Sequence, residues 1–127
     1  MFITALIAAG LAAAIHVYIF VLESLRWTHP STQRVFGIRS DDDAQTTKAL
    51  AFNQGFYNLF IALLVVVGIV VALAGSQTVG LTLLIAGCGI MLAAALVLVI
   101  SNYRMLRPAT IQGLLPLVAV VTAALAA

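Results

Sequence analysis

Four runs of apolar residues dominate this chain, and each is about as long as a helix that crosses a lipid bilayer, which needs roughly 20 residues. The runs cover about residues 2–26, 49–74, 79–103 and 109–126. Only helices and closed barrels satisfy every backbone hydrogen bond within a bilayer, and runs of this length indicate helices. The sequence therefore predicts an all-α, polytopic membrane protein. We expect a bundle of four transmembrane helices that forms a single domain over residues 1–127.

The composition agrees with a location in the membrane. Hydrophobic residues make up 64% of the chain and charged residues only 8%, whereas about a quarter of the residues of a soluble domain are charged. The first run lacks a basic segment before it and is longer than the core of a signal peptide, so we expect it to be retained as a helix. A net charge of +2 is too small for nucleic-acid binding. The expected partner is the lipid bilayer.

The basic residues indicate how the helices are oriented. All six flank the first and third connections between the runs, which lie on one side of the membrane: Arg26, Arg34, Arg39, Lys48, Arg104 and Arg107. Because basic residues concentrate on the cytoplasmic side, both termini are expected on the non-cytoplasmic side. We expect a multi-pass protein of a bacterial cytoplasmic (inner) membrane, with a cytoplasmic loop over about residues 27–48.

The long loop contains two local signals. The segment "PSTQRVFGI" fits a short helix at the membrane interface. Asp41, Asp42 and Asp43 fit the negatively charged start of the helix that follows. Consecutive side chains of a helix do not share a face, so these aspartates do not predict a metal site. The chain has no motif for a metal or a cofactor, and we expect neither.

Polar side chains gather at one depth of the predicted bundle. In the first helix, His16, Glu23 and Trp27 are spaced by seven and four residues and therefore share a face. Glu23 lies about one turn inside the cytoplasmic end. Gln112 lies at the same end of the fourth helix.

The second helix contributes the stretch "FNQGFYN" (residues 52–58) to this level. At ~100° per residue, its polar side chains fall within one arc of roughly 140°. They are Asn53, Gln54, Tyr57 and Asn58. We therefore expect these four to face one way. The non-cytoplasmic half of the helices has almost no polar side chain.

An unpaired polar group in hydrocarbon costs several kcal/mol, so these side chains must face one another or a water-filled pocket. We favour a cytoplasm-facing pocket that binds or transforms a small lipophilic or amphipathic molecule by acid–base chemistry. A carboxyl group there can hold or deliver a proton, and an imidazole can act as its partner. The candidate catalytic residues are Glu23 and His16. The candidate substrate-binding residues are Asn53, Gln54, Tyr57, Asn58, Trp27 and Gln112.

Three alternatives stay open at this point. The polar side chains can serve only to join helices through hydrogen bonds. A proton-coupled exporter with Glu23 as proton carrier is another reading, although alternating access needs a site near the midplane that both sides reach. A non-catalytic accessory membrane subunit is the third. Small residues on the helices also fit close packing within a bundle or within a homo-oligomer.

Three stretches carry a resemblance to a known family: "IHVYIFVLESLRW", "FNQGFYNLF" and "IQGLLPL". The chain resembles, over nearly its whole length, the small bacterial integral membrane proteins grouped as domain of unknown function 1304. The resemblance implies a four-helix membrane protein and brings no established activity.

Overall fold

The chain folds into helices joined by short connections. The computed structural model describes residues 1–127 and contains no strand. Its elements are α1 (Phe2–Phe20), the π-helical turn η1 (Val21–Leu25), α2 (Pro30–Phe36), α3 (Asp41–Leu73), α4 (Gln77–Ser101), the 3-10 turn η2 (Tyr103–Met105) and α5 (Leu106–Ala124). Four helical segments are long and apolar enough to cross a membrane: α1 with η1, α3, α4, and η2 with α5. The predicted all-α, polytopic four-helix architecture is confirmed.

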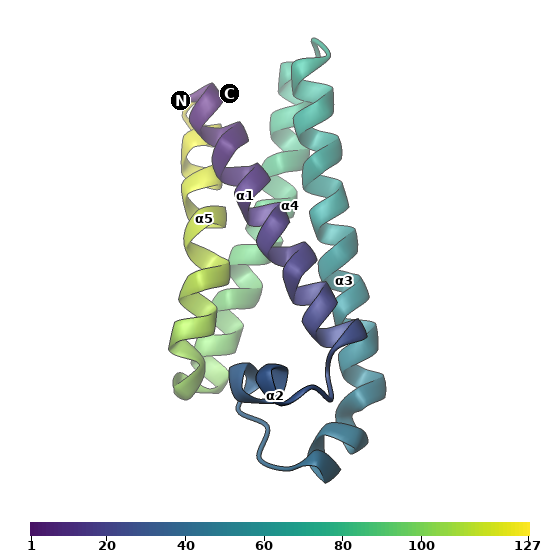
Figure 1. Cartoon of the computed structure of the whole chain (residues 1–127). Coiled ribbons are helices and arrows are strands. Elements are labelled where there is room, and N and C mark those ends of the chain that lie inside the picture. The colour runs from purple at the N-terminus through teal and green to yellow at the C-terminus, as the bar shows by residue number, and fades with distance from the viewer.

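The four long helices form an up-and-down bundle (Figure 1). α1 packs against α3 and α5, and α4 packs against the same two helices from the opposite side. Short connections between consecutive helices make them antiparallel neighbours. Both termini and the α3–α4 turn therefore lie at one end of the bundle, and α2 and η2 lie at the other. We call the latter the basic end, because all six basic residues lie in or beside η1, α2, η2 and the starts of α3 and α5.

The second spanning helix begins earlier than its apolar run. α3 starts at Asp41 rather than near residue 49, so the expected loop 27–48 is partly helical. The side chain of Ser40 accepts a hydrogen bond from the backbone N–H of Asp43 at 3.1 Å and caps the helix. The aspartates of the first turn complement its dipole. Because of these capping signals, the helix begins before the apolar run that crosses the bilayer.

The rest of the loop contains the short helix α2, which lies across the basic end (Figure 1). Pro30 occupies its first turn, where a missing N–H is tolerated. Gly37 ends it in the left-handed conformation, with a φ of 66°. The side-chain amide of Gln33 donates to Asp41 at 2.8 Å and so joins α2 to the start of α3.

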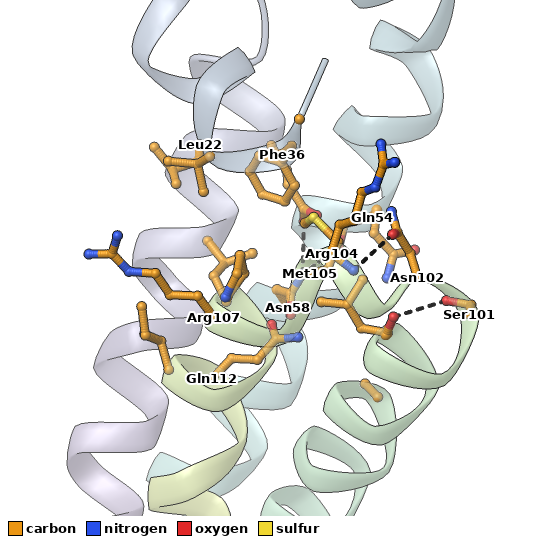
Figure 2. Close-up of a pocket in the computed structure, with 18 of the residues that line it drawn as sticks. Leu22, Phe36, Gln54, Asn58, Ser101, Asn102, Arg104, Met105, Arg107 and Gln112 are labelled. Carbon is orange, nitrogen blue, oxygen red and sulfur yellow. Dashed lines mark hydrogen bonds between the residues drawn. The ribbon is translucent and has the colours of Figure 1, made fainter. Parts of the chain in front are cut away.

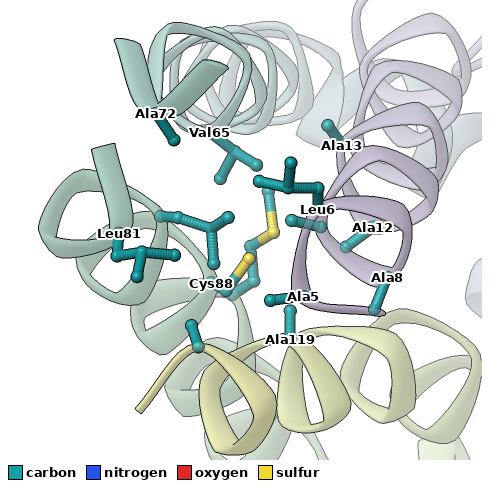
Figure 3. Packing of buried hydrophobic residues seen from close by; sticks show 14 of the residues in the cluster. Ala5, Leu6, Ala8, Ala12, Ala13, Val65, Ala72, Leu81, Cys88 and Ala119 are labelled. Atoms are coloured by element: carbon teal, nitrogen blue, oxygen red, sulfur yellow. The ribbon is translucent and has the colours of Figure 1, made fainter. Parts of the chain in front are cut away.

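Small side chains fill the bundle in the half that contains the termini. The core cluster has 15 buried residues, of which nine are alanine. Figure 3 shows the alanines of α1 facing Cys88 and Leu81 of α4. Large apolar side chains point outward instead, as Ile7, Val70 and Ile100 do with more than half of their surface exposed. This arrangement suits lipid, where close packing between small residues replaces the hydrophobic effect.

The close approach of α3 and α4 depends on glycine. A Cβ atom on Gly68 would lie 3.0 Å from the carbonyl oxygen of Gly80, and one on Gly80 would run into the backbone of Ala72. The two backbones are therefore in direct contact. This contact closes the half of the bundle that contains the termini.

Candidate functional site

The basic end of the bundle contains a cavity of about 1360 Å³. It is lined by side chains from every helix and is open at its mouth. Its polar lining includes Glu23, Gln54, Asn58 and Gln112. Its apolar lining includes Ile15, Ile19, Leu22, Val97, Leu98 and Ile111. A space of this kind, apolar with a few convergent polar groups, is typical of a small-molecule site.

A hydrogen bond between two helices lies in this cavity. The side-chain amide of Asn58 on α3 donates to Oε2 of Glu23 at 2.8 Å. The same nitrogen also contacts the carbonyl oxygen of Gln54 at 3.2 Å. Glu23 is 9% exposed, so its carboxyl group is largely removed from solvent. Two of the polar side chains that the sequence places at one depth, an acid and an amide, are therefore in direct contact.

Glu23 lies in the π-helical turn η1, which a hydrogen bond joins to α3. The N–H of Arg26 bonds to the carbonyl of Val21, five residues earlier, at 3.0 Å. Ser24 then donates a hydrogen bond from its hydroxyl to the carbonyl oxygen of Phe52 on α3 at 2.8 Å. Turns of this kind frequently occur at functional sites.

Gly55 allows η1 to lie against α3. A Cβ atom at this position would collide with the side chain of Ser24 and would lie 3.1 Å from the Cβ of Glu23. The glycine within "FNQGFYN" thus makes room for the turn that contains the acid. The amides at positions 54 and 58 flank it on the cavity side.

The expectation that the four polar side chains of "FNQGFYN" face one way is wrong. Gln54 and Asn58 line the cavity, as Figure 2 shows. Asn53 and Tyr57 line a separate groove of about 310 Å³ with Phe56 and Phe60. The two pairs stand one residue apart, so they point about 100° away from each other. That angle is wide enough to place them on different faces of α3.

The two remaining candidates do not line the cavity. His16 is buried, and its Nδ1 lies 2.9 Å from the carbonyl oxygen of Ala12. Since a carbonyl only accepts, Nδ1 must carry the proton of this bond. Trp27 donates from Nε1 to the hydroxyl of Thr47 at 3.1 Å, and its ring packs on Phe36 at 5.1 Å between centroids. Phe36 itself lines the cavity, so Trp27 supports the lining from behind.

Sequence reasoning missed the arginines of the cavity. Four of them contribute to its lining: Arg34, Arg39, Arg104 and Arg107. Figure 2 shows Arg104 and Arg107 on two sides of Asn58, with Phe36 nearby. The sequence does show that these arginines cluster at one end of the bundle. The positive-inside rule already explains this clustering by the orientation of the helices, so it did not indicate a cavity. No group of three or more His, Cys, Asp or Glu side chains is arranged to hold a metal ion.

Comparisons with known proteins identify the family of the chain and add no activity. No curated protein matches the chain, and no solved structure matches it. One family model matches residues 10–124, which include all four spanning helices in whole or in large part. Its description is "Protein of unknown function (DUF1304)". The chain belongs to this family, DUF1304.

Proposed function

We propose that this membrane protein binds a small lipophilic molecule in the cavity at the basic end and transforms it by acid–base chemistry. The observation that carries the proposal is the hydrogen bond between Asn58 and Glu23 inside a large, mainly apolar cavity. An ionisable residue within a membrane helix is a functional candidate by default. The positive-inside rule supports a cavity that opens to the cytoplasm.

In this proposal, Glu23 gives or takes the proton. Asn58 holds the carboxyl group in place, and the amides of Gln54 and Gln112 bind the polar part of the molecule. The apolar lining accommodates the lipophilic part. The buried position of His16, away from the cavity lining, does not support the catalytic role expected of it.

The filled half of the bundle favours this proposal over a proton-coupled exporter. Alternating access requires a site that both sides of the membrane reach in turn. The core cluster and the glycine contact between α3 and α4 occupy the half beyond the cavity. An exporter would have to separate helices whose backbones touch.

The experiment compares the compounds that copurify with variants of the full chain, using mass spectrometry of organic extracts. Glu23→Gln keeps the shape of the site but cannot supply the proton, so we expect it to accumulate a lipophilic compound that the wild type converts. In the Glu23→Gln background, Asn58→Ala should reduce the amount of that compound, whereas Asn53→Ala, on the separate groove, should leave it unchanged. Identical extracts from the wild type and Glu23→Gln would contradict the chemistry.

A second assay distinguishes the exporter. In proteoliposomes, an exporter would release protons when the copurified compound is added, and Glu23→Gln would abolish that release. A cavity that transforms its ligand by acid–base chemistry should give no coupled proton release. A release that depends on Glu23 would instead identify the protein as an exporter.

A further inference from the structure

The rim of the cavity, which contains Arg34, Arg39, Arg104 and Arg107, carries a strong positive charge. Its four arginines face only one acidic residue in the whole lining, Glu23. None of the four guanidinium groups donates a hydrogen bond to the protein, and none forms an ion pair. Of the four, only Arg104 has a side-chain partner. Its guanidinium carbon lies 6.0 Å from the centroid of the Tyr103 ring. The rim therefore offers unused donors in a geometry that suits phosphate and carboxylate groups.

The positive-inside rule explains only part of this arrangement. It accounts for the presence of all six basic residues at one end of the bundle. It does not account for the convergence of four of them on the cavity, while Arg26 and Lys48 lie at the same end outside its lining. These two residues therefore provide an internal comparison for the rim.

We propose that the cavity selects an amphipathic molecule whose anionic head group, a phosphate or a carboxylate, lies among Arg34, Arg39, Arg104 and Arg107. The apolar part of the molecule extends inward along Ile15, Ile19 and Leu98. This inference rests on the proposed ligand site and specifies the class of its ligand. It concerns binding alone and does not require Glu23 to act as an acid or a base.

The test uses the full-length protein in a nonionic maltoside detergent and follows the fluorescence of Trp27, the single tryptophan of the chain. Trp27 reports on the cavity because it packs on Phe36 in the lining. The probes are dodecyl phosphate, dodecyltrimethylammonium, dodecanol and inorganic phosphate. We expect dodecyl phosphate to bind the wild type at least about tenfold more tightly than the other three.

Two double variants remove the same amount of charge from the basic end. Arg104→Gln/Arg107→Gln should weaken the binding of dodecyl phosphate by about tenfold or more, since each arginine contributes a charge-assisted contact. Arg26→Gln/Lys48→Gln should stay within about twofold of the wild type. Arg104→Lys/Arg107→Lys keeps the charges but lacks the forked donors of arginine, so it should bind dodecyl phosphate more tightly than the glutamine variant and less tightly than the wild type.

Several results would overturn the inference. Equal losses in the two glutamine variants would mean that only the general charge of the basic end matters. Equal binding of dodecyltrimethylammonium or dodecanol would exclude selection for an anion. Inorganic phosphate that binds as tightly as dodecyl phosphate would identify a free anion as the ligand. Failure of the lysine variant to bind would show that positive charge is not what recognises the head group.

The proposed chemistry can fail independently of this inference. The rim variants test the selection of an anionic head group, whereas the extracts of Glu23→Gln test the proton transfer. If the rim variants behave as expected while the extracts of the wild type and Glu23→Gln are identical, the cavity is a binding site without the proposed proton transfer.

Discussion

At the scale of single residues, the carboxyl group of Glu23 has only part of its hydrogen-bonding capacity satisfied. Asn58 donates to Oε2, and no other side chain or backbone group donates to this carboxyl group. An ionised carboxylate has about four acceptor positions. The remaining positions are available to a ligand or to water, because Glu23 lines the cavity. In the proposed function, Asn58 is therefore a positioning residue that leaves acceptor positions of the acid free.

Two asparagines on α3 provide a matched test of this contact. Asn58→Ala removes the donor to a buried carboxyl group and should lower the free energy of unfolding by about 1–3 kcal/mol. Asn53→Ala, on the exposed groove, should change it by less than about 0.5 kcal/mol. Reversible denaturation in mixed micelles measures both values. Equal effects would mean that the hydrogen bond to Glu23 does not stabilise the fold.

The sequence predicts these residues unequally well. The meeting of Glu23 with Asn58 follows from the cost of leaving polar groups unpaired in hydrocarbon, which requires them to find each other at the same depth. The separation of Asn53 and Tyr57 from the cavity could not be predicted. An arc on one helix says how far the side chains spread, but it does not say which part of that arc faces the interior of the bundle.

At the scale of elements, the turn η1 changes which side chains of the first spanning helix share a face. Regular helical spacing predicts that Trp27 continues the face of His16 and Glu23. The i→i+5 bonds of η1 shift the register, and the helix ends at Leu25, so Trp27 turns toward Thr47 instead. No local residue pattern signals such a turn. It is stabilised by a tertiary contact, the approach of Ser24 to Gly55.

Glycine substitutions test whether this approach determines the site. In Gly55→Ala the added methyl group collides with Ser24, so α3 and η1 must separate. Overpacking of this kind typically lowers the free energy of unfolding by about 1–3 kcal/mol. The separation should also deform the cavity beside η1, so Gly55→Ala/Glu23→Gln should accumulate less of the lipophilic compound than Glu23→Gln alone.

Gly89→Ala is the control, because nothing lies within 4 Å of a Cβ atom at that position of α4. Alanine is the better helix former, so Gly89→Ala should be neutral or should stabilise the protein by up to about 1 kcal/mol. Thermal unfolding of both variants in the same detergent checks the comparison. A Gly55→Ala protein as stable as Gly89→Ala would contradict the role assigned to Gly55.

At the scale of the whole molecule, the bundle is filled in one half and open in the other. Alanine and glycine bring the helices together near the termini, whereas α2 and η2 cover an open cavity at the basic end. The number of helices follows from the four apolar runs, and the antiparallel order follows from the short connections. The shape of the cavity does not follow from either. It depends on α2, which tertiary contacts hold in place: Trp27 packs on Phe36, and Gln33 bonds to Asp41.

The orientation of the molecule in the membrane is open to a direct test with introduced cysteines. The natural Cys88 is fully buried in the core, so it should not react with a membrane-impermeant maleimide. Ser76, in the α3–α4 turn, and His29, before α2, are both exposed and lie at opposite ends of the bundle. Since the basic end should face the cytoplasm, Ser76→Cys should be labelled in intact spheroplasts.

His29→Cys should be labelled only in inside-out vesicles, and the wild-type protein should stay unlabelled in both preparations. The reverse pattern would place the cavity on the outer side and remove the cytoplasm as the source of its ligand. Labelling of each cysteine in both preparations would indicate dual insertion. A bias of six basic residues to none makes dual insertion unfavourable, because every inverted copy would have to move all six charges across the bilayer. One-sided labelling would therefore connect the charge asymmetry of the sequence to the side from which the ligand enters.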